Sequence, residues 1–136
     1  MTTTAPVPTL YEDTAPYWRA AVEGRFALPR CRACRRFHHH PRAWCPYCWC
    51  TDLEWAEPSG RGIVLTYTTV HQPPSPAFTA PYVLAVIELA EGPRMMANVV
   101  DCAPDTVRVG TPVQVTFEPR GDVAIPQFRP REETPS

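Results

Sequence analysis

The chain has 136 residues with 13 basic and 14 acidic side chains, a length that suits one domain or a small module joined to a modest one. Its net charge of −1 gives no overall field that would draw the molecule to nucleic acid or an anionic membrane. All thirteen basic residues are arginine, which excludes catalysis by a lysine side chain. There is no long apolar run and no secretory signal, so we expect a cytosolic protein with no membrane partner.

The N-terminal part predicts a loose start followed by a short helix. Residues 1–12 are mostly Thr, Pro and Ala, and we expect them to be flexible. The helix would be capped by Asp13 or Thr14, carry Pro16 in its first turn and end at Gly24 after roughly three turns. Its apolar face could pack on its own domain or on a second protein; the expected members are Tyr17, Trp18, Ala21 and Val22.

Two Cys-x-x-Cys pairs predict a metal site: Cys31 with Cys34, and Cys45 with Cys48. Zn²⁺ takes four thiolates at about 2.3 Å, and a two-residue gap lets one tight turn present two sulfurs to one ion. Four thiolates leave no open coordination position, so we expect a structural Zn²⁺ and not a catalytic one. Iron also suits four tetrahedral sulfurs, and the sequence does not separate the two metals.

Other ligand sets and one departure from the usual pattern accompany this motif. Cys50 could replace Cys48, and the histidines of residues 38–40 lie beside the first pair, although three consecutive side chains point in different directions. Many such turns carry glycine after the second cysteine, in a left-handed conformation. Arg35 and Trp49 stand there instead, at a cost of about 1 kcal/mol per turn.

From residue 60 the pattern becomes alternating and β-branched. Strands are predicted over residues 61–70, 82–89, 95–100, 112–117 and 122–127, with glycines at the breaks. Five short strands suit a small closed barrel of the OB-fold type, with a sandwich fragment as the alternative. The side chains expected to point inward are Ile63, Leu65, Tyr67, Leu84, Val86, Ile87, Met96, Val99, Val113, Val115 and Phe117.

The segment between the first two predicted strands, residues 71–81, contains four prolines. It would be stiff and non-helical, with Phe78 exposed and with His71 and Tyr82 at its ends. In an OB-fold the corresponding loop borders the usual ligand face. It is therefore either a preformed contact surface or a rim that closes the barrel. The whole chain divides into residues 1–12 (flexible), 13–60 (helix and zinc ribbon), 61–130 (OB-fold) and 131–136 (flexible).

Several motifs in a fixed order give the chain a family resemblance. An aromatic helix (PYWRAAVEGRF) is followed by CRAC, HPR, CPYC, TDLEW, SGRG, TYTTVHQPP, APYVLAVIEL and PQFRP. Over about residues 15–130 this order resembles the acyl-CoA-associated zinc-ribbon/OB-fold family. Its members are usually companions of thiolase-like enzymes, as in steroid side-chain aldolases, polyketide acetyl transfer, benzylsuccinate breakdown and archaeal hydroxymethylglutaryl-CoA formation.

The resemblance implies a non-catalytic subunit in a hetero-oligomer with a thiolase-like or ketosynthase-like partner. The ribbon and helix would dock the partner, and the barrel would help to shape a channel for acyl-CoA, a shared ligand of the complex. Residues 25–50 hold six arginines and no acid. Four thiolates with Zn²⁺ carry a charge of −2, so the net charge of this segment would be about +4. These arginines could face CoA phosphates, partner carboxylates or solvent. The candidate CoA or partner contacts are Tyr17, Trp18, Arg35, Arg36, Arg42, His71, Phe78 and Tyr82.

A rival class is single-stranded nucleic-acid binding, which zinc ribbons and OB-folds also perform. It needs a basic groove with stacking aromatics on the barrel. From residue 61 onward six arginines face eight acids, so that half of the chain carries −2. The residues also show no convincing set of nucleophile, base and orienting group, which places an independent enzyme last. We therefore expect no activity from the chain alone, but a required part of an acyl-CoA lyase or acyltransferase complex.

Overall fold

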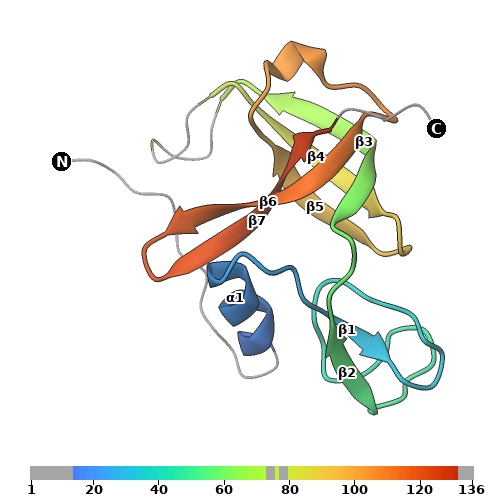
Figure 1. Cartoon of the computed structure of the whole chain (residues 1–136). Helices are drawn as coiled ribbons and strands as arrows, with labels where there is room; N and C mark the ends of the chain where they lie inside the picture. The colour runs from blue at the N-terminus through green and yellow to red at the C-terminus, as the bar shows by residue number, and fades with distance from the viewer. Residues whose placement is uncertain (1–13, 73–75, 77–79, 132–136) are drawn as a thin grey trace.

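The computed structural model describes residues 14–72, 76 and 80–131. The chain forms a helix, a small two-stranded ribbon and a five-stranded barrel, with the helix beside the ribbon below the barrel in Figure 1. The ribbon strands are β1 (Leu28–Cys31) and β2 (Leu53–Ala56), which pair antiparallel. The expected flexible ends, apart from residue 131, and the predicted contact residue Phe78 lie outside the described residues.

Helix α1 (Ala15–Val22) begins after Thr14 and carries Pro16 in its first turn. It ends where Gly24 adopts φ +77°, with the Gly24 N–H donating to the carbonyl of Ala21 at 3.0 Å. With eight residues it is shorter than the predicted three turns. It packs on two barrel strands of this same chain, β6 (Pro112–Arg120) and β7 (Val123–Pro130). No helix within the described residues is long and apolar enough to cross a bilayer.

The face of α1 differs from the prediction in two positions. Tyr17 and Ala21 are buried as expected, and Trp18 is half-buried. Val22 was placed wrongly, because its side chain is 56% exposed, and Ala20 takes the buried position instead. The buried residues Tyr17, Ala20 and Ala21 are three and four positions apart, so they share one face of the helix.

The barrel is closed in the order β3-β4-β5-β7-β6, which confirms the predicted five-stranded OB-fold and not a sandwich fragment. All neighbours pair antiparallel except β5 and β7, which run parallel. A short 3₁₀ helix, η1 (Pro104–Thr106), lies between β5 and β6. The strands are β3 (Arg61–Val70), β4 (Tyr82–Leu89), β5 (Arg94–Val99), β6 (Pro112–Arg120) and β7 (Val123–Pro130).

On several strands the prediction of which side chains point into the barrel was wrong by one residue. Ile63 is 40% exposed and Met96 is 63% exposed, whereas Val64 and Met95 are buried. In β3 the register shifts between Val64 and Thr66, and such a bulge moves the alternation by one residue. The residues that do fill the barrel are Val64, Val83, Ala85, Ile87, Leu89, Met95, Ala97, Val99, Val113 and Phe128.

The core is continuous from the barrel into the N-terminal part. Tyr17, Phe26 and Leu28 belong to the same buried cluster as the barrel interior, and the rings of Phe26 and Phe128 meet edge to face at 6.4 Å. Gly60 joins the ribbon to the barrel at φ +77°, and a Cβ there would lie 2.4 Å from Val115 Cγ1. Helix, ribbon and barrel are thus packed as one body, which fixes the surfaces between them.

Candidate functional site

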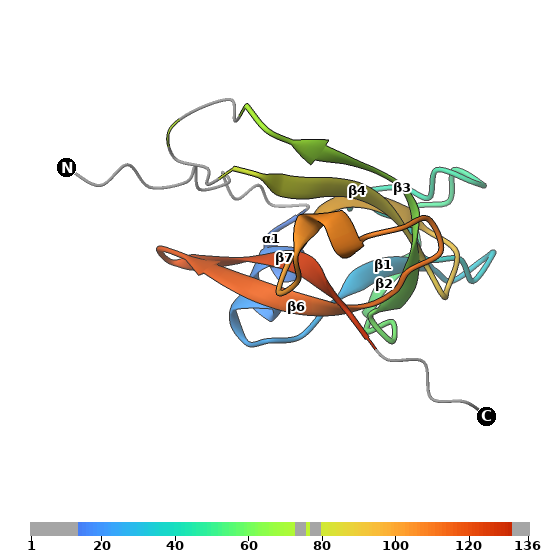
Figure 2. The same ribbon diagram turned by 90° about the horizontal axis from the view of Figure 1, so that it is seen from above.

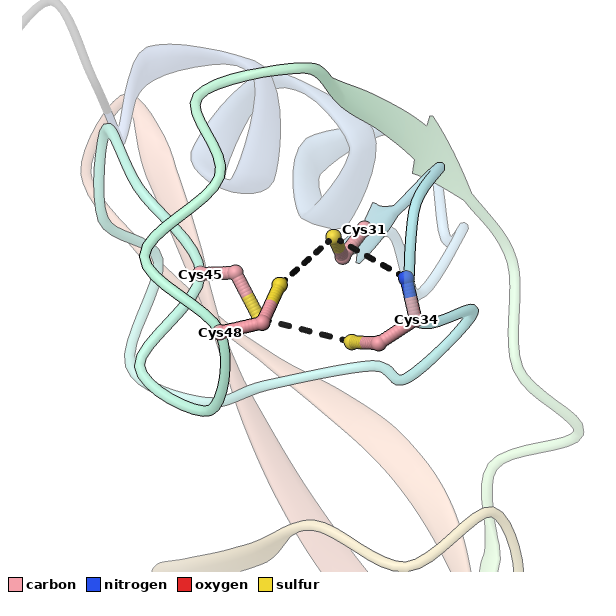
Figure 3. Close-up of side chains that lie close together, drawn as sticks. All are labelled: Cys31, Cys34, Cys45 and Cys48. Carbon is pink, nitrogen blue, oxygen red and sulfur yellow. Dashed lines mark hydrogen bonds between the residues drawn. The ribbon is translucent and has the colours of Figure 1, made fainter.

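The two Cys-x-x-Cys turns have the same backbone geometry. In each, the N–H four residues after the first cysteine donates back to that cysteine's carbonyl: Arg35 to Cys31 at 2.8 Å, and Trp49 to Cys45 at 2.9 Å. Arg35 and Trp49 both adopt φ 66°, the left-handed conformation that the sequence predicted for these positions. The tight turns bring the two sulfurs of each pair to one side, and Figure 3 shows the four side chains converging.

The four sulfurs have the spacing that a metal requires. They lie within 4.8 Å of one another, with Cys31 Sγ 3.5 Å from Cys48 Sγ and Cys34 Sγ 3.6 Å from Cys45 Sγ. Tetrahedral zinc with bonds of about 2.3 Å places its sulfurs about 3.8 Å apart. The N–H of Cys34 points at Cys31 Sγ and lowers the pKa of that thiol to about 6, whereas the pKa values of the Cys34 and Cys48 thiols beside it are raised. All six cysteines are free, so none forms a disulfide.

The alternative ligands have other contacts. Cys50 lies outside the four-sulfur group, and its sulfur accepts the N–H of Asp52 at 3.4 Å. His38 is buried and accepts the N–H of Arg42 through Nε2 at 3.3 Å. His39 lies 3.3 Å from the hydroxyl of Tyr17. The cage is therefore formed by Cys31, Cys34, Cys45 and Cys48, and its closed four-thiolate character fits a structural zinc.

The arginines of the ribbon are mostly paired within it. Glu54 accepts a hydrogen bond from Arg30 at 2.8 Å and lies within 3.7 Å of Arg32 and Arg35. The Arg30 hydrogen bond lowers the pKa of Glu54. Residues 23–57 hold six arginines and four carboxylates, so a zinc-loaded cage of −2 brings this module close to neutral. The net charge of +4 expected for residues 25–50 is thus largely cancelled by acidic residues that lie just before and just after this segment.

Arg36 and Arg42 differ from the others, because neither has a carboxylate partner within the described part of the chain. Arg36 stacks over the ring of Tyr47, with 5.1 Å between its guanidinium carbon and the ring centre. It also lines a cavity of about 250 Å³ between the ribbon and the β4–β5 turn, near Gly92. Both arginines remain available to an anionic partner group.

A larger cleft of about 310 Å³ lies where α1, the loop that carries the histidines of residues 38–40 (the histidine loop) and the barrel meet. Tyr17 and Trp18, both predicted contact residues, form part of its wall with His39 and His40. Their rings pack edge to face, with 4.8 Å between Tyr17 and Trp18. The barrel contributes the opposite wall, made of Leu84, Met95, Met96, Ala97, Asn98, Arg120, Ile125, Pro126 and Gln127.

The remaining predicted contacts do not join this cleft. Arg35 pairs with Glu54, and Arg42 is exposed in the loop after the histidines. His71 and Tyr82 lie at the far ends of β3 and β4 and line neither of the two cavities. Met96 and Gln127 were not predicted to line a cleft; the glutamine within an apolar strand was the one signal in the sequence.

The fold and the cage together define a zinc-ribbon protein with an OB-fold barrel. Two family models match the chain: a ChsH2 rubredoxin-like zinc ribbon domain over residues 18–54, and a ChsH2 C-terminal OB-fold domain over residues 55–118. A DUF35 domain-containing scaffold protein of Methanocaldococcus jannaschii is 40% identical over 74% of this chain and 73% of its own length. The chain belongs to this ChsH2/DUF35 family, which confirms the predicted acyl-CoA-associated zinc-ribbon/OB-fold resemblance.

Two further relatives are longer proteins. A probable enoyl-CoA hydratase alpha subunit of Thermomonospora curvata is 40% identical over 92% of this chain. The 3-oxo-4,17-pregnadiene-20-carboxyl-CoA hydratase alpha subunit of Mycobacterium tuberculosis is 30% identical over the same share. The chain spans 40% of the length of each.

Solved structures agree with the fold. A chain in the structure described as the Ltp2-ChsH2(DUF35) aldolase superposes with a TM-score of 0.82 at 39% identity, covering 91% of this chain and 98% of that one. A DUF35-family protein of unknown function from Sulfolobus solfataricus superposes at 0.62 over 88% of this chain and 86% of its own. At 14% identity the second likeness shows the fold alone.

Proposed function

We propose that this chain is a non-catalytic accessory subunit of an acyl-CoA enzyme complex of the aldolase, thiolase or acyltransferase type. It would bind a thiolase-like or ketosynthase-like catalytic subunit and help to shape the channel for acyl-CoA. The observation that carries the proposal is the match to the ChsH2(DUF35) aldolase structure, because it extends over 98% of that chain at 39% identity. Relatives described as scaffold proteins and as hydratase alpha subunits support an accessory role beside acyl-CoA chemistry.

The metal centre supports a scaffold role. Four sulfurs would complete the coordination of the ion, which leaves no position for a water or a substrate carbonyl. The ion would hold the ribbon in shape and supply no Lewis-acid chemistry. Because the cage uses free thiols, we also propose the reducing cytosol as the compartment.

The ribbon offers a surface suited to a protein partner. Trp44, Tyr47, Trp49 and Trp55 are exposed there, and Trp49 is 74% exposed. Aromatic side chains and arginines dominate the energetic centres of protein interfaces. Arg36 and Arg42, which have no internal carboxylate within the described residues, would pair with acids of the partner. We name Trp44, Tyr47 and Trp49, on the second Cys-x-x-Cys turn, the aromatic turn.

Co-expression with a thiolase-like protein encoded beside this chain tests the proposal. We expect a stable hetero-oligomer by light scattering after gel filtration, and acyl-CoA cleavage or acyl transfer that neither protein gives alone. Trp49→Ala should weaken the complex by about 2 kcal/mol, roughly 30-fold. Val109→Ala is the matched control, since Val109 is an exposed apolar residue of the barrel half, outside the aromatic turn.

Three results would count against the proposal. Failure to form a complex, with no gain in activity, would dismiss it. Turnover by this chain alone would show an enzyme. Salt-dependent binding of single-stranded oligonucleotides would favour the nucleic-acid alternative, although the near-neutral ribbon offers little charge for it.

A further inference from the structure

The cleft beside α1 marks the place where the barrel is least closed. Strands β5 and β7 are paired at a single position, Val99 with Phe128. In the next residue pair, the side chain of Gln127 replaces the missing strand contact, because its Oε1 accepts the N–H of Asn98 at 2.8 Å. Figure 2 shows the β3–β4 and β6–β7 hairpins spreading apart from each other. The cleft of about 310 Å³ lies on this side, lined by side chains of α1, β5 and β7.

The two walls of the cleft suit an apolar, ring-bearing group. One wall is aromatic, because α1 and the histidine loop contribute four rings. The centroids of the rings in contact lie 4.8 to 5.8 Å apart. The other wall is formed by thioether and aliphatic side chains of β5 and β7, including Met95, Met96 and Ile125. Methionine is polarisable and adapts its shape, and it makes favourable contacts with aromatic rings.

The polar groups of the cleft are satisfied by one another. Gln127 Nε2 donates to Asn98 Oδ1 at 3.1 Å, and the Asn98 amide donates to the carbonyl of Val83 at 3.0 Å. The Tyr17 hydroxyl meets His39 Nε2 at 3.3 Å. The charge of Arg120 is balanced by Glu118 at 3.3 Å. Among the described residues that line the cleft, the charge of Arg120 is thus paired and offers little attraction to a phosphate or a carboxylate.

Burial supports this neutrality on the aromatic side. It lowers the pKa of His39 to about 3, so that ring is uncharged at neutral pH. It also raises the pKa of Tyr17 far above the neutral range, which keeps the phenol protonated. A charged ligand would lose its hydration here without gaining a counter-ion.

We infer that this cleft binds the uncharged, ring-bearing or branched apolar end of an acyl group whose thioester is held by the catalytic partner. This inference rests on the proposed function and adds the location and chemical class of the subsite. The cavity volume of about 310 Å³ lies at the small end of ligand pockets, which fits one part of an acyl-CoA and not the whole molecule. The nucleotide end of CoA would lie elsewhere, since the cleft is neutral.

Two methionines of the cleft provide a direct test. With ¹³C-methyl methionine in the zinc-loaded 136-residue chain, the methyl signals of Met95 and Met96 report on the cleft, and a methyl standard added to the buffer serves as the reference. The probe is the N-acetylcysteamine thioester of 3-phenylpropanoic acid, which is neutral and carries one ring. We expect the Met95 and Met96 methyl signals to shift with a dissociation constant on the order of 1 mM or below. Coenzyme A without an acyl group, and free 3-phenylpropanoate, should leave both signals unchanged at the same concentrations.

A pair of variants localises the binding. Met96→Asp places a charge at the mouth of the cleft, where Met96 is 63% exposed, and should weaken binding about tenfold, because the carboxylate would lose hydration against an apolar ligand. Val109→Asp introduces the same charge at another exposed apolar position outside the cleft and should bind as the wild type does. Circular dichroism checks the fold of both, and Met96→Leu assigns the methyl signals if Met96→Asp fails to fold.

The outcomes separate this inference from the proposed function. If the hetero-oligomer forms and is active, but Met95 and Met96 stay silent in both the free chain and the complex, the inference is wrong and the proposed function stands. If coenzyme A alone shifts these methyls as strongly as the thioester does, the cleft is not selective for an apolar group and the inference is overturned. If the thioester binds but no complex forms with any thiolase-like partner, the cleft assignment stands and the proposed function fails.

Discussion

The ribbon and the barrel are stabilised in different ways. The buried apolar side chains between Leu28 and Ala56 are small and few, so the ribbon has little apolar core of its own: Leu28, Pro29, Cys31, Pro41 and Cys45. The barrel fills its interior with ten side chains from five strands. Stabilisation is thus concentrated on four sulfurs in one region and distributed over many contacts in the other. Loss of a single sulfur atom should therefore unfold the ribbon, whereas each substitution in the barrel core should remove only part of the stability of the barrel.

Loss of one thiolate should have the largest effect. Structural zinc binding contributes about 10–16 kcal/mol in small modules, so Cys34→Ser should abolish metal binding and unfold the ribbon. Elemental analysis should give one zinc per wild-type chain and almost none in the variant. Hydrogen exchange should show the amides of residues 31–52 losing protection, while the amides of the barrel strands keep theirs.

Cys50→Ser is the matched control for this experiment. Cys50 is a half-buried thiol two residues beyond Cys48, but it lies outside the four-sulfur group. The variant should keep its zinc. Loss of the metal from Cys50→Ser, or soluble wild-type protein without any metal, would contradict the assigned cage.

Removal of the largest buried barrel side chain should come next. Phe128 is fully buried and meets Phe26 edge to face, so Phe128→Ala should lower the free energy of unfolding by about 3–5 kcal/mol. Denaturant titration measures this change, and the fraction that remains folded should still hold one zinc. Ile63→Ala, at an exposed position of β3 in the same barrel, should stay within about 0.5 kcal/mol of wild type. Equal effects of the two substitutions would place the barrel core elsewhere.

Replacement of Gln127 should have an intermediate effect on the free energy of unfolding. Gln127→Leu leaves the N–H of Asn98 without its acceptor, at a cost of about 1–3 kcal/mol. The Asn98 amide should exchange faster with solvent, and the free energy of unfolding should fall. Gln114→Leu is the control, because the Gln114 amide bonds to Ser59 at the exposed edge of the barrel. If Asn98 exchanges equally slowly in both variants, Gln127 does not close the gap between β5 and β7.

Sequence predicted the ribbon better than the barrel interior, for a physical reason. The cysteine spacing fixes a local turn, so the cage and the left-handed Arg35 and Trp49 followed from short-range geometry. Strand positions also followed from composition. In β3 the inward phase did not, because the bulge after Val64 depends on pairing with β4 and not on the local residues.

The cleft and the charge balance escaped the sequence analysis because both depend on distant segments. Tyr17, His39, Met96 and Gln127 come from four separate stretches of chain that only the fold brings together. Likewise, the partner of Arg30 is Glu54, 24 residues away on the paired strand. A window of residues 25–50 therefore counted the arginines and omitted their counter-ions.

The prediction with the smallest expected effect tests the role of Trp49 in folding of the ribbon separately from its role in binding the partner. The left-handed conformation of Trp49 destabilises the turn by about 1 kcal/mol, whereas glycine adopts φ 66° without strain. Because the Trp49 side chain is largely exposed, Trp49→Gly should lose few internal contacts and should slow the release of zinc to a chelator. Trp55→Gly, at an exposed tryptophan within β2, should accelerate release, since glycine weakens a strand. With the catalytic partner present, Trp49→Gly should nevertheless bind more weakly than wild type. A variant that holds zinc longer and also binds the partner as tightly would show that the aromatic turn is not the docking surface.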